Sequence, residues 1–215
     1  MFVVGIDPGL SRCGYGVVQR DGRRQRAVAA GVIRTDPDHT VARRLAALRD
    51  DVHALLAEHR PAFVAIERVL FQVNVRTAIP VAQAAGVVMV EAVSAGCEVV
   101  EYSPNQVKQA IAGMGGADKE QMQRMVQTLL GLGSPLRPVD AADAVALALC
   151  HLAYAPLRER VGATSERRPA GGETARRRPP PSRGAERRSG QTHTTSGGPN
   201  EVVTPSRLAT GEVSG

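Results

Sequence analysis

The sequence of 215 residues has few cysteines. Cys13, Cys97 and Cys150 are far apart, odd in number and without a C-x-x-C pair. Small disulfide-stapled domains and zinc knuckles need closely spaced or evenly paired cysteines. The sequence therefore argues against both kinds of structure.

Long uninterrupted apolar segments are also absent. The longest apolar stretch, residues 81–100, contains Glu91 and Glu98, which exclude it as a membrane span. The first residues do not form the basic-then-apolar pattern of a signal peptide, because Asp7 and Arg12 interrupt them. We expect a cytoplasmic protein without a membrane partner.

The last part of the chain has a composition of its own. Residues 156–215 contain 7 Pro, 9 Gly and 6 Ser but only six large apolar residues, too few to offset the entropy of ordering the segment. We expect a disordered tail over 156–215 and one folded domain over 1–155. The tail carries 11 Arg and 6 Glu, so +5 of the net charge of +6 belongs to it. Such a tail either adds non-specific affinity for nucleic acid or is a solvated extension, and the sequence leaves both open.

The apolar pattern of residues 1–155 predicts strands alternating with helices. Three short β-rich runs joined by turns indicate an antiparallel meander, and two later apolar runs are too short for helices. The strands are expected at 2–7, 14–20, 27–35, 62–67 and 97–102, and the helices at 41–60, 74–95, 105–112, 118–132 and 139–154. This order indicates an α/β domain with a mixed sheet of about five strands flanked by helices.

Four carboxylates occupy notable positions in this pattern. Asp7 and Glu67 each end an apolar strand, while Asp140 and Asp143 are three residues apart in the first turn of a helix and share one face. Taken singly, each has an ordinary interpretation as a turn residue, a surface acid or a helix cap. Taken together they suit a cluster of hard oxygen ligands for Mg²⁺ or Mn²⁺, and not a zinc site.

Short motifs follow one another in a specific order around these carboxylates. They are GIDPGL at 5–10, AIE at 65–67, QVK at 106–108, KEQM at 119–122 and DAADA at 140–144. As a set they resemble the RuvC family of Holliday-junction resolvases over about residues 2–152.

The resemblance implies a ribonuclease H-like fold and a homodimer that cuts two opposed strands of a four-way DNA junction. It also implies that Asp7, Glu67 and Asp140 are catalytic, and that these three bind metal together with Asp143. We expect two Mg²⁺ ions about 4 Å apart around one phosphodiester, with Mn²⁺ as a substitute, and Asp7 as the bridging ligand. A branch-migration complex of RuvA and RuvB is the expected protein partner.

The resemblance also points to residues that bind DNA. Lys108 and Lys119 are the only lysines beside 25 arginines, and they fall where the family contacts phosphates near the cut site. Leu70 stands where the family commonly carries a base-stacking aromatic, and Phe71 is its neighbour. Arg76 is a candidate phosphate contact. Ordinary surface residues remain the alternative for both lysines and for Arg76.

Three other functions compete with junction cleavage. An actin-like or sugar-kinase ATPase needs two lobes, for which 155 residues are too few. A non-catalytic DNA-binding module would depend on the arginine tail, and a single-strand nuclease of the same fold would keep the carboxylates. The small residues Ala82, Gly86 and Val90 form a helical stripe that fits either a dimer contact or packing within the domain.

Overall fold

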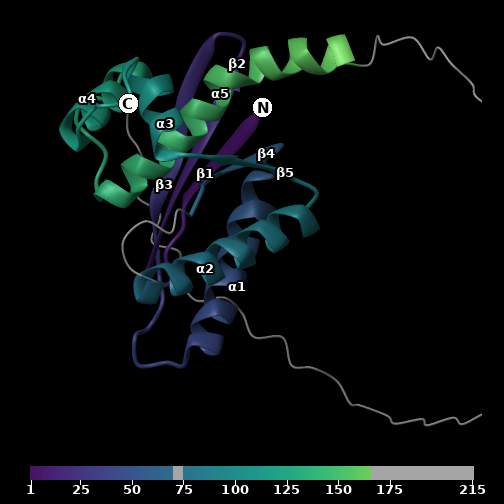
Figure 1. Cartoon of the computed structure of the whole chain (residues 1–215), viewed down its shortest axis with the longest axis vertical. Helices are drawn as coiled ribbons and strands as arrows, with labels where there is room; N and C mark the ends of the chain where they lie inside the picture. The colour runs from purple at the N-terminus through teal and green to yellow at the C-terminus, as the bar shows by residue number, and fades with distance from the viewer. Residues whose placement is uncertain (70–74, 166–215) are drawn as a thin grey trace, which may run out of the picture.

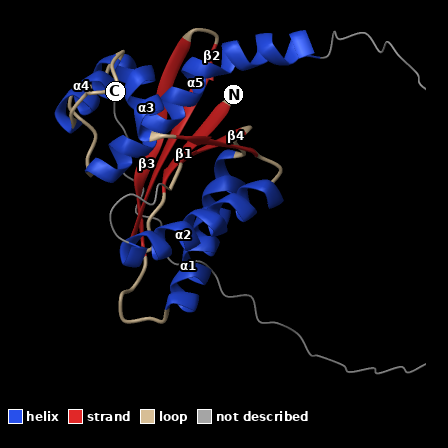
Figure 2. Ribbon diagram, in the orientation of Figure 1, coloured by secondary structure: helices blue, strands red, loops and turns tan. Residues whose placement is uncertain are grey.

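A mixed sheet of five strands runs through the middle of the protein. In the computed structural model, which describes residues 1–69 and 75–165, the strand order is β3-β2-β1-β4-β5. The strands are β1 (Phe2–Asp7), β2 (Arg12–Asp21), β3 (Arg24–Arg34), β4 (Phe63–Glu67) and β5 (Glu98–Tyr102). β1, β2 and β3 form an antiparallel meander, while β4 and β5 extend the sheet in parallel with β1 (Figure 2). The predicted α/β class and mixed five-stranded sheet are confirmed.

Helices cover both faces of this sheet. Apolar residues of α1 (Val41–His59) and α2 (Val75–Ser94) pack on one face. Those of α3 (Pro104–Ala112), α4 (Lys119–Leu130) and α5 (Val139–Ser165) pack on the other (Figure 1). Cys13, Cys97 and Cys150 are buried in these two layers as free thiols. Within the described residues no helix is both long and apolar enough to cross a bilayer.

Side-chain caps define where three of the helices begin. The hydroxyl of Thr40 accepts from a backbone N–H of the first turn of α1, so Thr40 and not Asp38 is the N-cap. Ser103 and Asp118 each form a capping box with a glutamine three residues later, at the starts of α3 and α4. The second box fixes Lys119 as the first residue of α4.

The last helix is longer than the sequence pattern predicts. The prediction ends this helix at Tyr154 and starts the tail at Pro156, whereas α5 continues to Ser165. The added segment contains Leu, Arg, Glu and Ala, which have good helix propensity and extend the helix past the proline. The expected tail beyond Ser165 lies outside the described residues, and the division of the chain at residue 155 stays a prediction.

Alternation along β1 directs its side chains to different layers. Val4 and Ile6 belong to the core beneath α1 and α2, whereas Val3 belongs to the core beneath α5. Because side chains alternate along a strand, Gly5 and Asp7 share the face of Val3. Asp7 therefore ends the central strand on the side that α5 covers.

Glycines allow α5 to lie directly on the sheet backbone. Gly5 and Gly16 are paired across β1 and β2. A Cβ built on Gly5 would overlap the carbonyl oxygen of Ala144 and lie 2.8 Å from the nitrogen of Ala148, and one on Gly16 would lie 2.7 Å from the nitrogen of Val145. Any side chain at these two positions would push the helix away from the sheet.

Gly5→Ala is expected to lower the free energy of unfolding by about 1–3 kcal/mol or more, because the added methyl meets helix backbone that cannot rotate aside. Gly115→Ala, in the loop between α3 and α4, is the control, since a Cβ there meets nothing within 4 Å. It should change stability by less than about 0.5 kcal/mol. Urea unfolding with equal m-values measures both. A Gly5→Ala variant as stable as wild type would show that α5 does not need this close approach.

Candidate active site

Asp7 and Glu67 are the last residues of two neighbouring parallel strands. The β1–β4 register pairs Ile6 with Ile66. The residues that follow them, Asp7 and Glu67, therefore lie side by side. Ile6 and Ile66 both belong to the core under α1 and α2, so Asp7 and Glu67 both face α5. The strand pairing alone therefore brings these two carboxylates together.

The N-terminal end of α5 supplies a third carboxylate to this site. Asp143 lines the same pocket as Asp7 and Glu67, which has a volume of about 300 Å³. Lys108 of α3 and Lys119 of α4 line this pocket as well. The structure thus brings together five of the residues that the sequence predicts for the site, from β1, β4 and three helices.

Burial and charge crowding shift the titration of this group. Burial is the main cause that raises the pKa of Asp7 from 3.8 to about 7, and the charges of Glu67, Asp143 and Asp140 raise it further. The pKa values of Glu67 and Asp143 are raised as well, chiefly by burial. Lys119 lowers the pKa of all three groups, so its ammonium acts on each of them. The cluster carries more negative charge than this lysine compensates.

Asp140 is not among the residues that line the pocket, and it forms an ion pair with Arg12 of β2. The Nε of Arg12 donates to Oδ2 of Asp140 at 2.7 Å, and its Nη2 lies 2.5 Å from the same oxygen. The Asp140 carboxylate thus takes an arginine as its partner rather than capping its helix. Among the described residues, no three His, Cys, Asp or Glu side chains converge closely enough to coordinate one ion in this arrangement.

The donor set nevertheless fits a hard divalent cation. Asp7, Glu67 and Asp143 offer only carboxylate oxygens, and no histidine or cysteine of the described residues lines their pocket. Their pKa values are raised by burial and by neighbouring negative charges, and a bound cation would offset both effects. Oxygen ligands of this kind suit Mg²⁺ or Mn²⁺. Asp140 would join them only by leaving Arg12.

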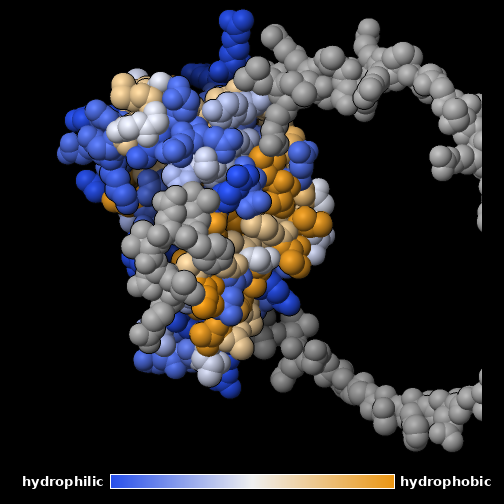
Figure 3. All heavy atoms as spheres, viewed as in Figure 1, coloured by the Kyte–Doolittle hydropathy of each residue, from blue (hydrophilic) through white to orange (hydrophobic). Residues whose placement is uncertain are grey.

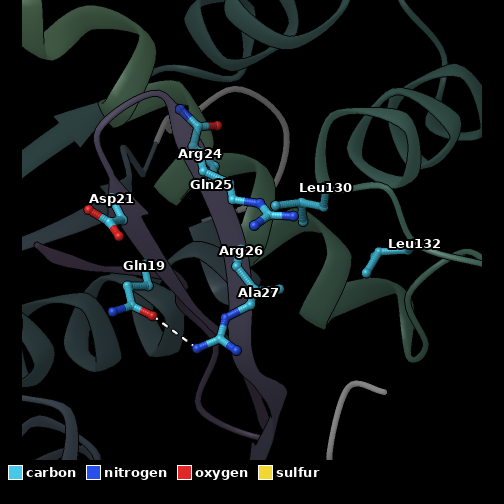
Figure 4. A pocket seen from close by; sticks show the side chains of 8 residues that line it. All are labelled: Gln19, Asp21, Arg24, Gln25, Arg26, Ala27, Leu130 and Leu132. Atoms are coloured by element: carbon cyan, nitrogen blue, oxygen red, sulfur yellow. Dashed lines mark hydrogen bonds between the residues drawn. The ribbon is translucent and has the colours of Figure 1, made fainter. Parts of the chain in front are cut away.

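A second hollow of about 600 Å³ lies at the far end of the β2–β3 hairpin, and it has a different character. Arg26 donates from Nη2 to Oε1 of Gln19 across it at 3.0 Å (Figure 4). Its lining is made of Gln19, Asp21, Arg24, Gln25, Arg26, Ala27, Leu130 and Leu132. With a single acid beside two arginines, this hollow does not form a carboxylate site.

Comparison with known proteins decides the family. The family model described as crossover junction endodeoxyribonuclease RuvC matches residues 3–151. This chain belongs to the RuvC family. A RuvC from Salinispora arenicola is 50% identical over 173 residues, which cover 80% of this chain and 99% of that protein.

Solved structures from the RuvC family share the fold. The structure of Thermus thermophilus RuvC has a TM-score of 0.69 and 40% identity, covering 74% of this chain and 97% of that one. T. thermophilus RuvC in complex with a Holliday junction substrate has a TM-score of 0.70 and 40% identity, with 74% and 96% covered. The ribonuclease H-like architecture expected from the motifs is confirmed.

The structure describes the positions of some, but not all, of the DNA-contact residues expected from the RuvC resemblance. Lys108 is half-buried and Lys119 is exposed, and both lie at the pocket. Arg76 lies in the first turn of α2. Leu70 and Phe71 fall outside the described residues, so their proposed contact with junction bases stays a prediction.

The sequence pattern missed a network that holds the loop after Asp7. Arg44 of α1 donates from Nε to the hydroxyl of Thr35 at 2.9 Å and from Nη2 to the hydroxyl of Ser11 at 2.6 Å. Thr35 in turn donates to the carbonyl of Leu10 at 2.5 Å. Neither this network nor the Arg12 ion pair has a sequence signal, because each joins residues from separate elements.

Asp7→Asn is expected to stabilise the metal-free protein at pH 8. The folded-state pKa of Asp7, about 7, lies above its ordinary value of 3.8, so the folded state holds this proton more tightly than the unfolded state does. The free energy of unfolding therefore falls as pH rises through this window, and the full penalty is present above pH 7. Asparagine avoids this penalty, which we put at about 1–3 kcal/mol.

Urea unfolding in EDTA at pH 8 and pH 5 measures this effect, and the gain from Asp7→Asn should be smaller at pH 5. Asp21→Asn, at the exposed end of β2, is the control and should change stability little at either pH. An equal effect of Asp7→Asn at both pH values would contradict the raised pKa.

Proposed function

We propose that this chain is a metal-dependent endonuclease that resolves four-way DNA junctions by cutting two opposed strands. The observation that carries the proposal is the meeting of Asp7, Glu67 and Asp143 with Lys108 and Lys119 in one pocket. Membership of the RuvC family supports it, as does the 40% identity to the T. thermophilus RuvC that was solved with a Holliday junction substrate. A substrate made of chromosomal DNA agrees with the cytoplasmic location expected from the sequence.

The carboxylates would hold the metal ions. Asp7 ends the central strand, and its pKa responds to Glu67, Asp143 and Asp140, so Asp7 is the ligand best placed to be shared. Glu67 would bind from the β4 side, and Asp140 and Asp143 from α5. The expected pair of Mg²⁺ ions, or Mn²⁺ in their place, would activate the attacking water and neutralise charge on the leaving oxygen.

The two lysines would bind the phosphate that is cut. Lys119 influences the pKa of three carboxylates, which indicates that a phosphate held at those carboxylates would also lie within its field. Lys108 approaches the same pocket from α3. A compact ammonium at this place stabilises negative charge that grows on the phosphate during hydrolysis.

Symmetric cleavage requires two active sites, and we propose that a second copy of this chain packs on α2. The exposed apolar residues of α2 are Ile79 at 50%, Val90 at 67% and Val93 at 64%. Apolar side chains gather over this region of the surface (Figure 3). Gly86 is exposed beside them, whereas the buried residues of α2, such as Val88, face the sheet. The exposed face is therefore available to a second copy, as a homodimer of the RuvC family requires. The partnership with RuvA and RuvB stays a prediction.

Asp7→Asn, Glu67→Gln and Asp140→Asn are each expected to abolish cleavage of a synthetic four-way junction in Mg²⁺. Junction binding in EDTA should stay within about twofold of wild type, because phosphates are bound mainly by cations while carboxylates hold the metal. Gel shifts and single-turnover cleavage measure the two properties separately. Asp21→Asn removes the same charge outside the pocket and should leave both unchanged. Binding that is lost together with cleavage would overturn the assignment of these residues to catalysis.

Val90→Arg is expected to convert the dimer into a monomer, because it places a charge in the centre of the proposed apolar contact. Leu129→Arg is the matched control, since Leu129 is 46% exposed on α4, on the opposite side of the sheet. Light scattering during size-exclusion chromatography gives the mass of each protein. A monomeric wild-type protein, or a Val90→Arg variant that stays dimeric, would contradict an α2 interface.

A further inference from the structure

Asp140 is one of the predicted metal ligands, and in this structure it forms an ion pair with Arg12. Both contacts of the guanidinium, from Nε at 2.7 Å and from Nη2 at 2.5 Å, end on the same Oδ2 oxygen. The two side chains are 43% and 29% exposed, so a cation from solvent can reach them. Oδ2 has little capacity left for a metal ion, so a cation bound by both oxygens of this carboxylate would have to displace the guanidinium.

The backbone of Asp140 packs directly against the sheet. Gly14 of β2 lies against it, and a Cβ built on Gly14 would lie 2.8 Å from the carbonyl carbon of Asp140 and 3.2 Å from its Cβ. This end of α5 therefore lies directly on the backbone of β2. A rotation of the Asp140 side chain away from Arg12 would bring its carboxylate toward the pocket without moving the helix.

The charge of Asp140 already acts on the pocket. It raises the pKa of both Asp7 and Asp143, although its carboxylate is bound by Arg12. Without a compensating cation, a fourth carboxylate would add to the repulsion in the metal-free site. Arg12 places its positive charge directly on the Asp140 carboxylate.

We propose that Arg12 is a positioning residue that competes with the divalent cation for Asp140. It binds the Asp140 carboxylate in the metal-free protein and releases it when the cation enters. This inference rests on the proposed function, because it assumes that the carboxylates hold a divalent ion. It assigns to Arg12 a role that opposes metal binding, although the residue lies beside the site.

Arg12→Ala is expected to bind Mn²⁺ more tightly than wild type. A partly exposed ion pair of this kind corresponds to about a two- to fivefold change in an equilibrium constant. Isothermal titration calorimetry of the full chain with Mn²⁺ alone, without DNA, measures the affinity directly. Arg12→Lys should lie between the two proteins, because it keeps the charge but loses the planar pair of donors.

Arg34→Ala is the matched control. Arg34 lies opposite Arg12 in the β2–β3 register and is exposed, so its loss removes one positive charge from the same end of the sheet. It should raise the Mn²⁺ affinity less than Arg12→Ala does. Equal effects of the two variants would mean that only the general field of the arginines matters, and would overturn the proposal.

A double-mutant cycle separates competition from damage to the fold. In an Asp140→Asn background, Arg12→Ala should no longer tighten Mn²⁺ binding, because the contested carboxylate is gone. Weaker Mn²⁺ binding by Arg12→Ala would indicate a structural role for the arginine and refute competition. Wild-type protein that does not bind Mn²⁺ at all would instead overturn the proposed metal-dependent function itself.

Discussion

The close contact of α5 with the glycine backbone of β1 and β2 is the constraint on which the site depends. A helix that lay on ordinary side chains would be farther from the sheet, and its first turn would not reach the end of the central strand. Because Gly5 and Gly16 have no side chains, Ala144 and Val145 approach the strands directly. This packing delivers the carboxylate of Asp143 to the pocket at the end of β1.

The same packing brings carboxylates close together, and two basic side chains offset part of their negative charge. Burial, and in second place the charges of the neighbouring carboxylates, raise the pKa of Asp7 to about 7. Lys119 offsets part of this charge from α4, and Arg12 forms an ion pair with Asp140. Because the buried carboxylates repel one another without a cation, the site is suited to bind one. The same repulsion lowers the stability of the metal-free fold at the place that function requires.

Much of the arrangement follows from sequence patterns, and the remainder depends on contacts between distant elements. The short apolar runs at Phe2–Asp7 and Phe63–Glu67 predict the strands, and their parallel pairing places Asp7 beside Glu67. The position of α5 could not be predicted in this way, although glycines at alternate positions of β2 are a signal for close packing. The ion pair of Arg12 joins residues 128 positions apart, which no local pattern records. The helical segment after Pro156 was missed because proline and flexible residues indicated a stop.

Anomalous diffraction from crystals of the full chain grown with Mn²⁺ would locate the metal ion directly. We expect anomalous density in the pocket, bonded to the carboxylate oxygens of Asp7 and Glu67, with Asp143 facing the ion from α5. Density elsewhere on the protein, with none between Asp7 and Glu67 in a preparation that cleaves junctions, would show that the carboxylate pocket is not the metal site.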